Sequence, residues 1–197
     1  GNILIHNGQE LAWIVSNGGS AGTTYKLTNN IYLNRLDDVI NWKTGATPAG
    51  YTPTPWYTSK TFNGNLDGDG YTVYGLYFNA GVDTSAMSNG FGTAAGLIPN
   101  IPNGSNTVVS KVGVDYMFIN APSTASPLVG SVGSNVSSDP GTTLTIDQCY
   151  VGETVYVTAA AAGHVRGFAM WCNLTVTNTY SLATVRSNEE STAFDPE

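Results

Sequence analysis

FNGNLDGDGYTVYGLYF, the stretch from Phe62 to Phe78, begins a pattern that the rest of the chain repeats. The apolar-x-x-apolar-x-apolar frame occurs at Val73, Leu76 and Phe78, at Val109, Val112 and Val114, at Ile146, Cys149 and Val151, and more weakly at Val176, Thr179 and Ser181. The frames start at positions 73, 109, 146 and 176, so the intervals are 36, 37 and 30 residues. A repeat of this length is typical of a solenoid.

Each repeat contains further short apolar runs between the frames. Three runs precede a frame, at Gly96–Ile101, Pro127–Val132 and His164–Met170, and two follow one, at Met117–Ile119 and Thr154–Val157. One coil would therefore hold about three short strands separated by turns. Stacked coils place equivalent strands side by side in parallel, roughly 4.8 Å apart. The sequence thus predicts an all-β fold, a parallel β-helix.

The frame also predicts which side chains face inward. One internal column would hold Leu76, Val112, Cys149 and Thr179, and another Phe78, Val114, Val151 and Ser181. The outward columns would then be Tyr74, Ser110, Asp147 and Thr177, and beside them Tyr77, Gly113, Tyr150 and Tyr180. We therefore expect Tyr77, Tyr150 and Tyr180 to share one exterior line.

The chain divides into a cap, a set of coils and a tail. Residues 1–61 form the predicted N-terminal cap, with a helix at Asn7–Val15, a strand at Tyr25–Leu33 and a Trp- and Pro-rich loop up to the coils. Asn7 is the predicted N-cap, because Glu10 follows it at capping-box spacing. Residues 62–186 form the predicted coils, and residues 187–197 an acidic tail or the start of a further repeat.

Several of these segments resemble one family of proteins. The Phe62–Phe78 run resembles the FxGxLDGxGYTIxGL opening of secreted or cell-surface bacterial right-handed parallel β-helix proteins with GLUG-type repeats. AGLIPNI followed by VSKVGV, and then TIDQCYVGETV, resemble later parts of those repeats, while ELAWIV and YKLTNNIYL resemble the family's cap helix and first strand. GLIPNI and PLVGSV depart from the usual position of the second glycine. The resemblance covers most of Asn7 to Val185.

The resemblance implies a fold and a class of function. The fold would be a right-handed parallel β-helix, a solenoid, with a short N-terminal capping helix. The protein would be a non-catalytic module of a bacterial surface protein, located outside the cell and engaged in adhesion or in carbohydrate binding. Two alternatives remain open. One is a structural spacer or filament-forming assembly module that self-associates through an open C-terminal coil, and the other is a fragment of a polysaccharide lyase or hydrolase.

The charge pattern argues against two kinds of partner. The net charge is −7, from 14 acidic and 7 basic residues, and the bases are scattered from Lys26 to Arg186. Nucleic acids and anionic membranes both require clustered basic side chains. No run of about 18 apolar residues is present, so we expect no membrane insertion.

Metal binding has one weak candidate. Asn63, Asn65, Asp67 and Asp69 place oxygen ligands at the alternate positions with which a calcium loop begins. The twelfth position of such a loop would be Tyr74 rather than a bidentate acid, so a plain turn is the favoured interpretation. Cys149 and Cys172, with no zinc-type spacing, are expected to be buried free thiols rather than a disulfide. We therefore expect no cofactor.

Acidic residues do not form a convincing catalytic set. Asp147 is the single acid in the predicted outward columns, and Asp115 and Glu153 follow one step further round the coil. No paired carboxylates at a defined spacing accompany them, so the chain is not expected to be an enzyme.

Aromatic residues are the better functional candidates. The predicted exterior line of Tyr77, Tyr150 and Tyr180, and Trp42, Trp56 and Tyr57 in the proline-rich loop, offer flat rings with polar edges. Such rings suit sugars, which present C–H faces bordered by hydroxyls. The competing interpretation is that the tyrosines stabilise neighbouring strands and the tryptophans hold a loop in place. The expected partner is an extracellular glycan or another surface protein.

Overall fold

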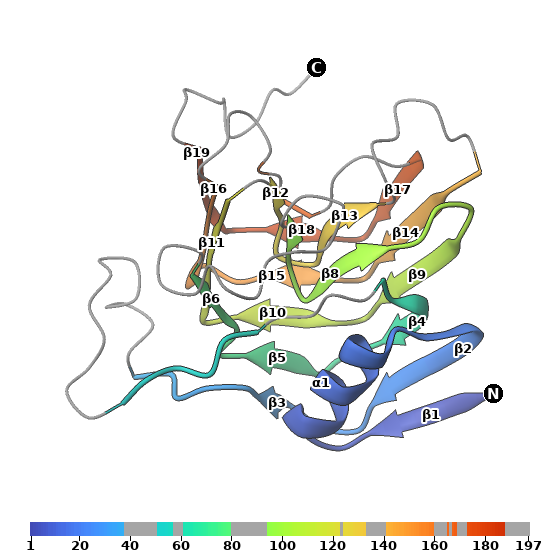
Figure 1. The fold of residues 1–197 in the computed structure, drawn as a ribbon, viewed down its shortest axis with the longest axis horizontal. Coiled ribbons are helices and arrows are strands. Elements are labelled where there is room, and N and C mark those ends of the chain that lie inside the picture. The colour runs from blue at the N-terminus through green and yellow to red at the C-terminus, as the bar shows by residue number, and fades with distance from the viewer. Residues whose placement is uncertain are drawn as a thin grey trace.

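A computed structural model describes residues 1–37, 51–56, 61–79, 94–122, 124–132, 141–159, 165, 167–168 and 173–187. These residues form short β-strands and one α-helix (Figure 1). All the strand pairings in these ranges are parallel. The predicted all-β class is therefore confirmed.

The strands form three larger sheets and two small ones. The six-stranded sheet has the order β1 (Asn2–Ile5), β2 (Gly19–Leu27), β4 (Asn63–Asp67), β9 (Asn106–Ser110), β14 (Thr143–Asp147) and β17 (Asn173–Thr177). The five-stranded sheet has the order β3 (Ile31–Tyr32), β5 (Thr72–Tyr74), β10 (Gly113–Asp115), β15 (Tyr150–Val151) and β18 (Tyr180–Ser181). The four-stranded sheet has the order β6 (Tyr77–Asn79), β11 (Met117–Ala121), β16 (Val155–Ala159) and β19 (Thr184–Ser187). The small sheets pair β7 (Ala94–Ala95) with β12 (Thr124–Ala125), and β8 (Ile98–Ile101) with β13 (Val129–Val132).

The chain passes through the larger sheets in the same order each time. It runs from β4 to β5 and β6, and later from β9 to β10 and β11, from β14 to β15 and β16, and from β17 to β18 and β19. Each pass lays its strands against those of the preceding pass, so β1 and β3 lie at one end of the stack and β17 and β19 at the other (Figure 1).

The predicted register is right for the later copies and wrong for the first. Val109 pairs with Ile146, and Val114 with Val151, as the frame requires. However, Val73 pairs with Val114 rather than lying level with Val109, whose partner is Leu66. The cause is the turn at residues 68–71, because four residues separate β4 from β5 whereas two separate β9 from β10. Sequence spacing alone cannot distinguish a longer turn from a shifted strand.

Inward columns form the core of the stack. Val73, Val114 and Val151 are fully buried in one column, which also contains Ile31 and ends at the half-buried Ser181. Phe78 is also buried, but its register partner is Ile119 in the four-stranded sheet. The predicted column that joins Phe78 to Val114 is therefore wrong, because the longer turn at 68–71 also shifts Phe78 relative to the later copies.

The predicted helix is confirmed. Helix α1 (Gly8–Asn17) begins after Asn7, whose side-chain oxygen accepts the backbone N–H of Glu10 at 2.9 Å. The Glu10 carboxylate in turn accepts the Asn7 side-chain amide at 3.2 Å, so the two side chains hold each other while Asn7 satisfies one backbone N–H that a helix start leaves free. Gly18 ends the helix in the left-handed conformation, with φ of 90°.

The predicted strand Tyr25–Leu33 is in fact two strands. A corner at residues 28–30 separates β2 from β3 and moves the chain from the six-stranded sheet to the five-stranded one. Thr28 Oγ1 donates to the Ile5 carbonyl at 3.1 Å, and Asn30 Oδ1 accepts the Thr72 N–H at 2.9 Å. These polar residues therefore stabilise a bend between two strands, where the prediction had one continuous strand.

Candidate functional site: a tyrosine face on the five-stranded sheet

The outer surface of the five-stranded sheet carries two neighbouring columns of tyrosines. Tyr32 on β3 pairs in register with Tyr74 on β5, and Tyr150 on β15 pairs with Tyr180 on β18. Their strand neighbours, such as Val73, point inward, so the tyrosines point outward. We call Tyr32, Tyr74, Tyr116, Tyr150 and Tyr180 the tyrosine face.

The rings of this face contact one another in pairs. Tyr32 and Tyr74 stack with centroids 5.1 Å apart and planes 16° from parallel. Tyr150 and Tyr180 stack at 5.9 Å and 19°. Tyr116, which directly follows β10, meets Tyr74 edge to face at 6.3 Å. Parallel strands place register partners close enough for these contacts, which stabilise the sheet as well as forming a surface.

Gly113 allows the two stacked pairs to meet. It lies in register between Thr72 and Tyr150, and a Cβ at this position would overlap the Tyr150 ring. The ring therefore leans across β10, and its hydroxyl is 2.5 Å from Thr72 Oγ1. Burial raises the pKa of the Tyr150 hydroxyl, the hydrogen bond to Thr72 opposes this shift, and the nearby Tyr74 adds to it. The aromatic surface thus crosses the whole sheet.

Exposure is greatest at the two ends of the tyrosine face. Tyr32 and Tyr180 are exposed, whereas Tyr74, Tyr116 and Tyr150 are half-buried. A ligand would therefore meet the most exposed rings on β3 and β18, and the half-buried rings between them.

The two nearby acids, Asp115 and Asp147, each accept hydrogen bonds from their own local partners. Asp115 Oδ1 accepts the N–H groups of Tyr116 at 2.8 Å and Thr154 at 3.1 Å, and a Cβ on Gly152 would overlap its carboxylate. Asp147 lies on the six-stranded sheet, where it accepts the Thr177 hydroxyl at 2.6 Å. This bond, with those from Asn178 and Gln148, lowers the pKa of the Asp147 carboxyl. The two carboxylates therefore lie on different sheets and have separate partners.

The structure separates the residues of the predicted exterior line. Tyr150 and Tyr180 lie together as expected, but Tyr77 is buried on the four-stranded sheet, where it stacks on Phe118. Trp56 is also buried, and its Nε1 donates to the Leu97 carbonyl at 3.0 Å. Tyr77 and Trp56 are therefore corrected to core positions. Trp42 and Tyr57 lie outside the described residues.

Tyr32, Tyr74 and Tyr116 are the members of the face that sequence reasoning missed. Tyr74 was expected level with Ser110, because the first copy was misaligned, whereas its register partner is Asp115 on the five-stranded sheet. A register that aligns Leu66 with Val109 and allows two extra residues in the turn at 68–71 places Tyr74 level with Asp115, and so next to Tyr116.

The weak calcium candidates are held by separate partners. Asn65 Oδ1 accepts the Val108 N–H, and Asp67 Oδ1 accepts the Asp69 N–H, each at 2.9 Å. Asp69 forms an ion pair with Lys26 at 2.9 Å, which raises the pKa of that lysine. Asn63 belongs to β4 itself. Across the described ranges, no group of three or more His, Cys, Asp or Glu side chains is placed to hold a metal ion.

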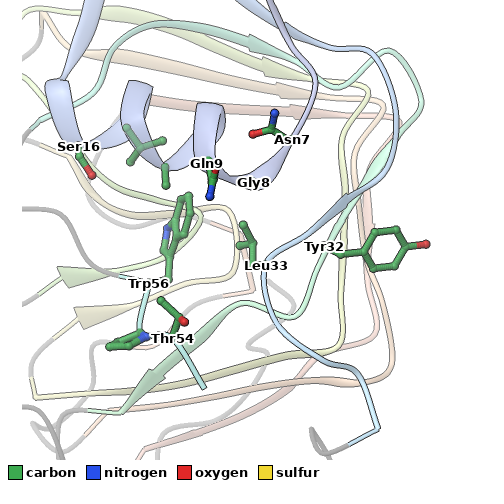
Figure 2. Close-up of a pocket in the computed structure, with 11 residues that line it drawn as sticks. Asn7, Gly8, Gln9, Ser16, Tyr32, Leu33, Thr54 and Trp56 are labelled. Carbon is green, nitrogen blue, oxygen red and sulfur yellow. The ribbon is translucent and has the colours of Figure 1, made fainter. Parts of the chain in front are cut away.

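A pocket adjoins one end of the tyrosine face, beneath α1 (Figure 2). Its volume is about 690 Å³, and its lining includes Asn7, Gln9, Ser16, Leu33, Thr54 and Trp56. Tyr32 also borders the pocket, but its ring points away from Leu33 and Trp56 in Figure 2. The pocket and the tyrosine face therefore share a backbone segment and present different side chains.

Asn34 ties the 51–56 segment to the sheets. Its Nδ2 donates to the carbonyls of Thr54 and Gly75, each at 2.9 Å, and its Oδ1 accepts the Tyr51 hydroxyl at 2.8 Å. A single buried amide thus fixes the wall of the pocket and the strand that carries Tyr74.

Comparison with known proteins adds no relative. No protein-family model, no curated protein and no solved structure matches the chain. Within the part of the chain that the structure describes, no helix has the length and apolar character needed to cross a membrane.

Proposed function

We propose that the chain is a non-catalytic, extracellular right-handed parallel β-helix module that binds polysaccharide through the tyrosine face. The observation that carries this proposal is the aromatic surface formed by two stacked pairs, Tyr32 with Tyr74 and Tyr150 with Tyr180, which lie on either side of β10 in one sheet. The resemblance of the Phe62–Phe78 segment to GLUG-type repeats supports the bacterial cell-surface context and a role in adhesion. The repeated order of the sheets supports the β-helix.

The chemistry of the face suits a sugar chain. Neighbouring strands of a sheet lie roughly 4.8 Å apart, so Tyr32 and Tyr74 form one short column along the stacking direction, and Tyr150 and Tyr180 form a second column beside it. A linear polysaccharide lying along the two columns would place C–H faces on the exposed rings of Tyr32 and Tyr180. Its hydroxyls could then bond the phenol of Tyr150 and its neighbours.

Charge favours a neutral polysaccharide over an acidic one. Asp115 lies on the strand between the two stacked pairs, and the chain as a whole carries a net charge of −7. A uronate or sulfated chain would meet repulsion at this surface, whereas a neutral glycan would not.

Binding to a panel of soluble polysaccharides tests the proposal. Affinity electrophoresis or calorimetry should detect binding to at least one neutral glycan. Tyr180→Ala and Tyr32→Ala should each weaken it about tenfold, because truncating an interface aromatic commonly costs more than ~1 kcal/mol.

Trp13→Ala is the matched control. Trp13 is an exposed aromatic on α1 and belongs to neither stacked pair, so its removal should leave binding unchanged. Equal losses in Trp13→Ala and Tyr180→Ala would contradict the proposed surface, as would the absence of binding to every glycan. Release of new reducing or unsaturated sugar ends by the wild-type protein would contradict the non-catalytic role.

A further inference from the structure

Among the strands that the structure describes, the six-stranded sheet has one edge strand at each end of the stack. These are β1 and β17, which lie far apart in Figure 1. Neither NILI nor NLTVT contains a charged residue or a proline. Protein edges usually carry such residues to prevent pairing with another chain. Both edges are therefore chemically able to accept a further parallel strand.

One inward column joins the two edges. Its register partners, in order along the sheet, are Ile3, Tyr25, Leu66, Val109, Ile146 and Val176. The four interior members are buried, whereas Ile3 is 47% exposed and Val176 is 38% exposed. The apolar core is thus open at both ends of the same column.

We propose that copies of this chain associate head to tail, with β17 of one copy pairing in parallel with β1 of the next. The existing ladder determines the register, because its continuation puts Ile3 of the second copy opposite Val176 of the first. Both strands run in the same direction within one parallel sheet, so a second copy moved along the stack presents β1 in the required orientation.

Each end also offers further apolar surface for this contact. Leu174, two residues before Val176 on β17, is exposed. At the first end a groove of about 670 Å³ is lined in part by Ile3, Leu4 and Trp13. The interface is heterologous, since two different surfaces meet. Because the copies are related by a shift along the stack rather than by a closing rotation, the contact would produce linear chains of copies.

Self-association is measured on the 197-residue chain by sedimentation velocity or native mass spectrometry over a range of concentrations. The wild type should form dimers and longer species as concentration rises. Val176→Lys and Ile3→Lys should each weaken association about tenfold or more, because each buries a charge at the contact.

Val108→Lys is the matched control. Val108 is 37% exposed, close to the value for Val176, but lies on the interior strand β9 and points outward. Its replacement should leave association unchanged. Circular dichroism identifies variants that fail to fold. If Val176→Lys fails to fold, Leu174→Lys replaces it, and if Ile3→Lys fails to fold, Ile3→Ser replaces it.

Mixing the two end variants separates this arrangement from a symmetric dimer. Ile3→Lys keeps an intact β17 edge and Val176→Lys keeps an intact β1 edge, so a mixture should form a 1:1 heterodimer while each alone stays monomeric. A wild type that stays monomeric at all concentrations would overturn the proposal. Self-association of the single variants at the wild-type level, or a mixture without heterodimer, would also overturn it. None of these outcomes depends on glycan binding.

Discussion

Two stacked aromatic pairs in this protein have nearly the same geometry and opposite environments. Tyr150 and Tyr180 stack at 5.9 Å and 19°, and Tyr77 and Phe118 stack at 5.8 Å and 20°. Tyr180 is 57% exposed, whereas Tyr77 and Phe118 are 8% and 5% exposed. The parallel ladder therefore produces the stacking in both sheets, but it does not decide which pair reaches solvent.

The difference comes from what covers each sheet. Tyr51, Tyr116 and Tyr156 pack against the pair on the four-stranded sheet. The backbone N–H of Trp56 donates to the Tyr77 carbonyl at 2.6 Å, so the 51–56 segment is attached to β6 of the four-stranded sheet. On β18, in contrast, Tyr180 is open to solvent. The pair of Tyr150 and Tyr180 can therefore contact a ligand, whereas the pair of Tyr77 and Phe118 is buried.

The largest expected effect is at the covered pair. Phe118→Ala should lower the free energy of unfolding by about 3 kcal/mol, because it removes a buried ring and leaves a cavity between Tyr77 and Tyr156. Denaturant unfolding measures the loss. A change below ~1 kcal/mol would show that the covered pair is not part of the core.

Gly113→Ala should have a smaller effect on stability. The new Cβ would overlap the Tyr150 ring and lie 2.7 Å from Thr72 Oγ1, so the half-buried ring must swing outward, toward solvent. The expected cost is about 1 kcal/mol, from the lost bond to Thr72. Thr72→Val, which removes the same bond without moving the ring, is the matched control for denaturant unfolding. A loss several times that of Thr72→Val would mean that the ring cannot move aside.

Tyr180→Ala should change stability by about 0.5 kcal/mol, since an exposed cross-strand pair contributes little. The same unfolding assay measures the change, and Tyr180→Phe, which keeps the stacked ring, should be neutral. A loss as large as that of Phe118→Ala would contradict the contrast between the two pairs.

The smallest effect concerns pH. Burial raises the pKa of Tyr150, so folding favours its neutral form. This contribution to stability is complete below the ordinary tyrosine pKa of about 10 and is lost as pH rises through the folded-state value. Phenolate absorbance during alkaline titration should show one late-titrating group that is absent in Tyr150→Phe. In Gly113→Ala that group should titrate earlier, and no difference between Gly113→Ala and wild type would count against the buried hydroxyl.

Local sequence was sufficient for some of these features. The Asn7–Glu10 capping pair predicted α1, because its hydrogen bonds join residues three positions apart. The neighbouring position of Tyr150 and Tyr180 was also predictable, since the third and fourth copies have equal spacing between their frames and tyrosines. The position of Tyr77 was not predictable, because the turn at 68–71 lengthens the first copy and shifts the register of the residues that follow it.

The sequence by itself determined the short parallel strands, the capped helix and the register of the later copies, because these depend on spacing and on contacts between near neighbours. Only the tertiary structure decided that Tyr32 and Tyr74 join Tyr150, and that Tyr77 and Trp56 are buried. Both outcomes depend on which segment packs over which sheet. That packing is set by contacts between residues some 40 positions or more apart, such as Asn34 with Gly75 and Trp56 with Leu97, each separated by 41 positions.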